Sequence, residues 1–167
     1  MEHHLIKWNR DHTAISQPDL KMDNNTSTDV FFQNLNRIIS ELIVDGYIES
    51  FGIWHQVFFI DFDFNGEANR LSFNCFTRIN QKDKQLDMTE AEHTLLCLYK
   101  IKSLRALEAN CNDRGELHIK FDDNIHFQLI PNPLDEFDEP WQLTDGVPHE
   151  QGGRTIIASS HGGYAVW

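Results

Sequence analysis

The chain has 167 residues, 40% of them hydrophobic and 11% aromatic, and its 26 acidic against 14 basic residues give a net charge of −12. So many aromatic residues exclude wholesale disorder, and the charge argues against nucleic acid as a direct partner. There is no apolar run of ~18 residues, no basic-then-apolar N-terminus, and only three cysteines, so we expect a cytoplasmic protein with reduced thiols and no membrane partner.

The first third of the sequence predicts an arm followed by a helix. Residues 1–26 are polar and aperiodic, which indicates an irregular N-terminal arm. Apolar residues then recur at helical spacing, which predicts a helix over about 28–44. Asp45-Gly46 is a natural end for this helix.

A pattern of antiparallel strands follows, from Tyr47 to Phe76. Asn65-Gly66 is typical of a two-residue hairpin turn. That turn places apolar residues opposite apolar residues and sets Asp61 opposite Arg70, so the predicted register is self-consistent.

The second half predicts another helix and more strands. Thr89 and Glu92 form a capping box ahead of a helix over about 90–101. Glu116–Ile130 reads as a hairpin whose loop is the three residues 122–124. Short closing strands are expected at Trp141–Leu143, Thr155–Ala158 and Tyr164–Trp167. We therefore predict one α+β domain over 27–167, mainly an antiparallel, curled, hairpin-rich sheet with two helices.

Asp61 and Asp63 are the strongest candidates for metal-dependent chemistry. Both carboxylates fall on one face of a strand, an arrangement that can bind Mg²⁺ in hydrolases and nucleases. Arg70 should neutralise Asp61 across the strands, however, and no downstream Glu-x-Lys completes a nuclease set. A structural role is the favoured interpretation.

The remaining reactive side chains form no recognisable catalytic set. His118 and His126 share the polar face of one hairpin, but Lys120 lies beside them and would repel a cation. Ser159-Ser160-His161 are sequence neighbours, whereas a nucleophile and its base normally come from different elements. Cys111 lies near a turn, a position that allows exposure, but no basic cluster nearby indicates a reactive thiol. We predict no catalytic residues, cofactor or metal.

Residues 121–150 hold eight acidic residues and no Lys or Arg, and so supply −8 of the net charge. A solvated acidic loop is one interpretation, and a docking surface for a cationic partner is the other. Phe137 and Trp141 within the cluster favour docking, although Trp141 suits a core equally well. The predicted partner-binding residues are Asp122, Asp123, Asp135, Glu136, Phe137, Asp138, Glu139, Trp141, Asp145 and Glu150, with Trp54 and His55 of a predicted strand connection as a second candidate.

The C-terminal third resembles a small bacterial domain family of unassigned function. Members of that family end in W-x-L, a short strand, a Gly-Gly turn and a terminal A-V-W, as Trp141-Gln142-Leu143 and residues 156–167 do here. The hairpin Glu116–Ile130 is similar to the one that precedes this tail in the family. The resemblance carries no catalytic motif.

In size, acidity and lack of catalytic residues the chain also resembles immunity proteins of bacterial toxin systems, in particular contact-dependent growth inhibition. The resemblance implies a cytosolic protein that binds one cognate toxin domain, often a basic nuclease, and blocks its active site or its access to substrate. An RNA-targeting nuclease is the expected toxin. The alternatives are a small metal-dependent hydrolase or nuclease that uses Asp61 and Asp63, and a non-catalytic assembly module; a homodimer is left open.

Overall fold

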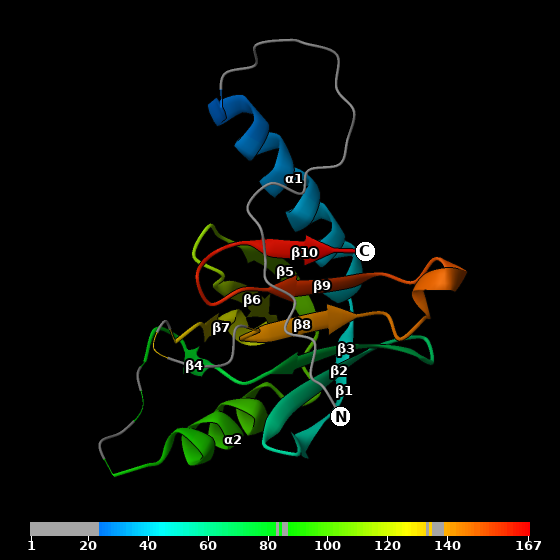
Figure 1. Ribbon diagram of the computed structural model, residues 1–167. Coiled ribbons are helices and arrows are strands. Elements are labelled where there is room, and N and C mark those ends of the chain that lie inside the picture. Colours follow the sequence, from blue (N-terminus) through cyan, green and yellow to red (C-terminus); the bar gives the residue numbers. More distant parts are fainter. Residues whose placement is uncertain (1–23, 83, 85–86, 133, 135–138) are drawn as a thin grey trace, which may run out of the picture.

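Two helices and two antiparallel sheets make up the part of the chain that the computed structural model describes, residues 24–82, 84, 87–132, 134 and 139–167 (Figure 1). In chain order the elements are α1 (Asn24–Ile43), β1 (Tyr47–Trp54), β2 (Val57–Phe64), β3 (Glu67–Phe73), β4 (Phe76–Ile79), α2 (Glu90–Ile101), β5 (Ala106–Cys111), β6 (Leu117–Phe121), the 3₁₀ turn η1 (Asp122–Asn124), β7 (Ile125–Ile130), β8 (Trp141–Thr144), the 3₁₀ turn η2 (His149–Gln151), β9 (Thr155–Ala158) and β10 (Tyr164–Val166). The predicted α+β class with two helices is confirmed.

The strands divide into a six-stranded sheet, in the order β1-β2-β3-β8-β9-β10, and a four-stranded sheet, in the order β4-β7-β6-β5. The two sheets meet at one corner, where an isolated bridge pairs Tyr47 with Arg105 and the Ile48 amide donates to the Leu104 carbonyl at 3.0 Å. The predicted curled sheet is thus present as two open sheets joined at this corner.

The predicted registers within the hairpins are confirmed. Asp61 pairs with Arg70 across β2 and β3, on either side of the Asn65-Gly66 turn. The β6–β7 hairpin turns through the three residues of η1, as the alternation of its apolar residues requires.

The chain changes sheets at Asn74 and Cys75, between β3 and β4. Phe73 is the last paired residue of β3, beside Trp141 of β8, and Phe76 is the first residue of β4, beside Ile130 of β7. The start of β8 lies next to this crossing, where the Asn74 amide donates to the Pro140 carbonyl at 2.9 Å.

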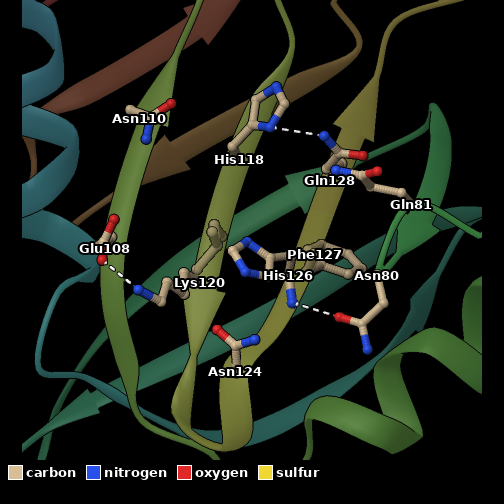
Figure 2. Close-up of a pocket in the computed structure, with 11 residues that line it drawn as sticks. Asn80, Gln81, Glu108, Asn110, His118, Lys120, Asn124, His126, Phe127 and Gln128 are labelled. Carbon is tan, nitrogen blue, oxygen red and sulfur yellow. Dashed lines mark hydrogen bonds and ion pairs between the residues drawn. The ribbon is translucent and has the colours of Figure 1, made fainter.

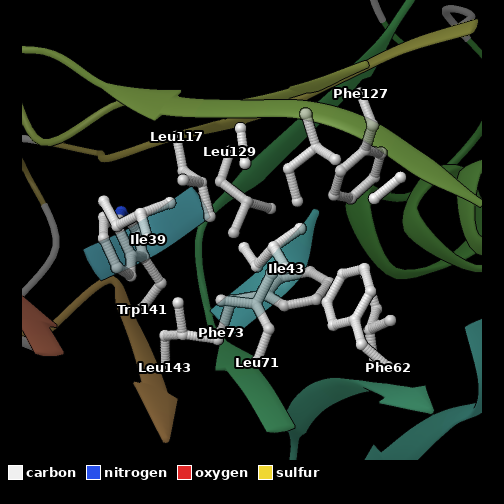
Figure 3. Close-up of a cluster of buried hydrophobic side chains, with 14 of the residues drawn as sticks. Ile39, Ile43, Phe62, Leu71, Phe73, Leu117, Phe127, Leu129, Trp141 and Leu143 are labelled. Atoms are coloured by element: carbon white, nitrogen blue, oxygen red, sulfur yellow. The ribbon is translucent and has the colours of Figure 1, made fainter. Parts of the chain in front are cut away.

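The core lies between the two sheets, with part of α1 inserted into it (Figure 3). Ile39 and Ile43 of α1 lie among apolar side chains from both sheets. The labelled residues around them are Leu117, Phe127 and Leu129 of the four-stranded sheet and Phe62, Leu71, Phe73, Trp141 and Leu143 of the six-stranded sheet. All ten labelled side chains are at most 1% exposed, so burial of these residues is the main stabilising term of the fold.

Helix α1 covers the outer edge of β5 through side-chain hydrogen bonds. The Asn36 carboxamide donates to the Cys111 carbonyl at 3.3 Å and accepts from the Cys111 amide at 2.7 Å. Ser40 donates to the Ala109 carbonyl at 3.1 Å. These contacts satisfy backbone groups that an uncovered edge strand would leave open.

The first turn of α1 begins at Asn24, one turn before the predicted start. Thr26 to Asp29 resemble an N-cap, but Ser and Thr also fit a first helical turn when the apolar stripe downstream holds the helix. The rest of the predicted N-terminal arm, residues 1–23, lies outside the described residues.

Helix α2 lies against β4 and begins as predicted. Thr89 accepts from the Glu92 amide at 3.2 Å, and the Glu92 carboxylate accepts from the Thr89 amide at 2.8 Å, which completes the capping box. Thr94 of α2 is buried against β4, where its hydroxyl lies 3.1 Å from that of Thr77. The helix is therefore fixed to the sheet at the strand that follows the crossing point.

Candidate partner-binding surface

The tip of the β1–β2 hairpin presents a large aromatic side chain to solvent. His55 and Gln56 have φ of 49° and 70°, the left-handed values of a two-residue turn that matches the twist of a hairpin. Trp54, directly before this turn, is 68% exposed, and its ring centroid lies 5.3 Å from that of His55. An exposed tryptophan on a rigid turn is the type of side chain that anchors protein–protein contacts.

The hairpin tip is apolar on both faces. Trp54 pairs with Val57 on one face, whereas Ile53 pairs with Phe58 on the other, because neighbouring residues of a strand point to opposite sides. Ile53 is 47% exposed and Val57 38%. A partner that straddles the tip would bury apolar surface on both sides.

A groove lies on the Ile53 side of the tip, between the hairpin, the β3–β4 crossing and α2. We name it the tip groove; its volume is about 450 Å³ and its lining is Ile53, Gln56, Phe58, Asn74, Cys75, Phe76, Glu90, Ala91, Thr94 and Asn132. This volume falls within the range of ~300–1,000 Å³ that is usual for ligand sites. Phe76 remains 39% exposed at its edge.

Both described ends of the acidic β7–β8 connection border the tip groove. Asn132 lines the groove, and Asn74 in its wall donates to the Pro140 carbonyl. Leu134 and Glu139 are exposed within this connection. The structure thus brings the two predicted regions, the Trp54-His55 tip and the acidic segment near Glu139, to neighbouring positions.

Trp141 is a core residue, so its prediction as a binding anchor is wrong. Its side chain is 1% exposed, and its indole Nε1 donates to the Gly115 carbonyl at 2.7 Å. As the first residue of β8 it points between the sheets. Acidic residues next to Trp141 in the sequence do not indicate whether its own side chain is buried. The aromatic-acidic pattern therefore gave a wrong prediction at this residue.

Asp145 is also unsuited to binding a partner's cation. Its carboxylate accepts from the amides of Arg154 and Val147 at 3.0 to 3.1 Å and faces the Arg154 guanidinium at 3.5 Å. It therefore stabilises the connection between β8 and β9 instead of projecting to solvent.

The other predicted acidic residues lie at separate places. Asp122 and Asp123 are in the β6–β7 turn, whereas Glu150 is in η2, beyond the far end of β8 from Glu139. Among the described residues, Asp122, Asp123, Glu139 and Glu150 have no ion-pair partner within 4 Å. Asp122 accepts weakly from the Arg105 amide at 3.3 Å. The predicted residues Asp135, Glu136, Phe137 and Asp138 lie outside the described residues.

Asp61, the leading residue of the metal hypothesis, is held by a cation. Its carboxylate accepts from Arg70 Nε at 2.7 Å and Nη2 at 2.9 Å, and from the Ser50 hydroxyl at 2.6 Å. Asp63 accepts from the Gly66 amide at 2.8 Å in the turn. No cluster of three or more metal-ligating side chains occurs among the described residues.

Burial opposes ionisation of Asp61, but the hydrogen bonds from Arg70 and Ser50 outweigh it and hold its pKa below the ordinary value. Arg70→Ala should therefore destabilise the protein at pH 7 by about 1–2 kcal/mol, less than for a fully buried pair because the guanidinium is 46% exposed. The stabilisation is fully present above ~3.9, the unfolded pKa of Asp, and is lost as pH falls through the lowered folded value.

Urea unfolding of the wild type and the variant, at pH 7 and at successively lower pH, measures this effect. Arg37→Ala is the matched control, since Arg37 forms an exposed pair with Glu41 and should change stability by only ~0.5 kcal/mol. A difference between wild type and Arg70→Ala that did not shrink below pH ~4 would contradict the assignment to Asp61.

A second depression, the polar groove, lies on the outer face of the four-stranded sheet (Figure 2). Its volume is about 590 Å³, and its lining is Asn80, Gln81, Glu108, Asn110, His118, Ile119, Lys120, Asn124, His126, Phe127 and Gln128. His118 pairs with Gln128 and His126 with Lys120, so the two histidines share one face of the hairpin with Lys120 beside them, as predicted. Gln128 donates to His118 at 2.8 Å and Lys120 pairs with Glu108 at 2.7 Å, so much of this lining is already paired within the sheet.

The cysteines differ in their exposure. Cys97 of α2 is buried. Cys111, whose place near a turn allowed exposure, is buried too, because α1 covers the edge of β5. Burial raises the pKa of both thiols, that of Cys111 to about 11. Cys75, in the wall of the tip groove, is partly exposed.

Comparison of the chain with models of known protein families, with curated proteins and with solved structures gives no match. The resemblances drawn from the sequence therefore stay predictions. None of the described helices combines the length and the apolar composition needed to cross a bilayer.

The tip groove was not predictable from the sequence, although Trp54 and His55 at the turn beside it were predicted as a binding candidate. Cys75, Phe76 and Ala91 come from segments that are unremarkable by themselves. Only the change of sheet after β3 brings Phe76 and α2 next to the hairpin. In the sequence, the apolar residues on either side of His55-Gln56 were the available signal.

Proposed function

We propose that this chain is an immunity protein, which binds a cognate basic toxin domain in the bacterial cytosol and neutralises it by stoichiometric binding. The toxin expected is a nuclease that acts on RNA. The protein performs no chemistry in this role; it occupies the surface that the toxin needs for its substrate.

The observation that supports the proposal most directly is the exposed apolar hairpin tip beside the acidic connection. Trp54, Ile53 and Val57 supply an aromatic and aliphatic contact area on either side of a two-residue turn. Such a centre with a polar, charged rim is the usual anatomy of a specific protein interface.

The charge distribution supports a cationic partner. The chain carries −12 overall. Glu139, next to Pro140 at the tip groove, has no ion-pair partner within 4 Å among the described residues. A nuclease binds phosphates through basic side chains, so an acidic inhibitor is attracted to the same surface and reaches it faster.

Two charge reversals test the role of the acidic connection. Glu139→Lys, next to Pro140 at the tip groove, should slow association with the toxin roughly threefold at low salt. Glu150→Lys makes the same charge change in η2, at the far end of β8, and should leave the rate nearly unchanged. Stopped-flow mixing with the toxin domain encoded beside this gene, at two ionic strengths, gives both rates.

Equal effects of the two reversals would mean that overall charge, not the position of Glu139, governs association. Absence of a complex with the toxin domain encoded next to this chain would refute the proposed function itself. Light scattering of the protein alone distinguishes the assembly alternative, in which a second copy covers the tip and the chain is dimeric without any toxin.

A further inference from the structure

The tip groove has the dimensions and chemistry of a site for another protein's side chains. Its floor and walls include Ile53, Phe58, Phe76 and Ala91, and its volume of about 450 Å³ exceeds that of one side chain. It is open to solvent beside an exposed hairpin tip, so a partner that covers the tip reaches the groove without any rearrangement of the described elements.

The rim of the groove is acidic. Glu90 of α2 lines the groove. Glu139 lies one residue before Pro140, whose carbonyl accepts a hydrogen bond from the Asn74 amide in the groove wall. The positive end of α2 does not reverse this sign, because the capping-box carboxylate of Glu92 covers it. Glu90 forms an ion pair with Lys84 at 3.4 Å, so the negative charge of the rim rests mainly on Glu139, for which the described residues supply no ion-pair partner within 4 Å.

We infer that the tip groove accepts one or two aliphatic or aromatic side chains carried on a cationic segment of the toxin, with Lys or Arg beside them. The inference rests on the proposed function and adds the place and the chemistry of the contact. An apolar side chain gains from burial against Ile53 and Phe76. The flanking cations are attracted to the exposed Glu139 and compete with Lys84 for Glu90.

Cys75 provides a direct readout of groove occupancy in the full-length protein. It is partly exposed in the groove wall, whereas Cys97 and Cys111 are buried thiols whose pKa is raised by burial. A maleimide at pH 7 should therefore reach Cys75 in preference to the two buried thiols. Bound toxin should slow this labelling at least tenfold.

The control thiol is placed outside the groove. In a Cys75→Ser, Glu150→Cys variant the reactive cysteine lies in η2, and the toxin should leave its labelling rate unchanged. Complex formation is measured separately by gel filtration, so that the two questions have separate answers.

A pair of substitutions on α2 tests the contact itself. Ala91→Arg places a long cation in the groove and should weaken toxin binding at least tenfold. Leu96→Arg adds the same side chain to the same helix, about 140° around its axis, and should bind normally.

The outcomes are separable. A stable complex in which Cys75 reacts at the free rate, or in which Ala91→Arg binds as well as Leu96→Arg, overturns the groove assignment and leaves the proposed function standing. Absence of any complex overturns both. Protection of Cys75 that grows with protein concentration in the absence of toxin assigns the groove to a second copy and also overturns the inference.

Discussion

Replacement of Trp141 by alanine should lower the free energy of unfolding by about 3–5 kcal/mol, the largest effect that we expect from any single change. The indole is 1% exposed and lies between the sheets near Ile39 and Phe73. Alanine would leave a large cavity at the start of β8 and would also remove the hydrogen bond from Nε1 to the Gly115 carbonyl. Urea unfolding followed by circular dichroism measures the loss.

Two further variants separate the contributions. Trp141→Phe keeps most of the ring and removes the hydrogen bond, so it should cost about 1–3 kcal/mol. Trp167→Ala removes a tryptophan that is 47% exposed and should change stability by less than ~1 kcal/mol. Similar stabilities for Trp141→Ala and Trp167→Ala would be inconsistent with the buried position of Trp141.

Trp54→Ala should weaken binding of the proposed toxin by about 2 kcal/mol or more, roughly a 30-fold rise in Kd, while stability stays nearly unchanged. The side chain is largely exposed in the free protein, so its removal costs little in folding. In the complex the Trp54 side chain would be buried against the toxin, and the alanine variant would lack that buried apolar area. Calorimetric titration with the toxin domain gives the affinity.

Trp167→Ala serves as the control for this experiment as well, because it removes an exposed tryptophan that follows β10. A Kd that rises equally in both variants would show that tryptophan exposure in general, not the hairpin tip, affects the measurement. An unchanged Kd for Trp54→Ala would exclude the tip as an energetic centre of the interface.

The secondary structure was predicted well wherever the signal for it lay within a few consecutive residues. The Asn65-Gly66 turn set the pairing of Asp61 with Arg70, and Thr89 with Glu92 marked the start of α2. The division into two sheets was not predictable in this way. Leu71, Phe73, Thr77 and Ile79 are buried at alternate positions and only Cys75, at the crossing, departs from the alternation, so the local pattern does not reveal that the pairing partner changes from β8 to β7.

The candidate surface was predictable only in part, for a similar reason. Exposure of Trp54 follows from its position beside a tight turn, but burial of Trp141 depends on strands that are distant in sequence. Glu139 and Asp145 are close in sequence but lie at opposite ends of β8. Asp145 forms an ion pair with Arg154. Composition indicates the sign of a partner's charge but not the position at which it binds.

The hydrogen bonds of Asn36 have a consequence for how this molecule can associate. A carboxamide offers a donor and an acceptor side by side, as a peptide group does, so Asn36 stands in for a neighbouring strand at Cys111. At that position α1 covers the edge of the four-stranded sheet. A further strand could pair with β5 there only after α1 had separated from the core. Stacking of copies through this border is thereby blocked, which favours recognition through loops and turns.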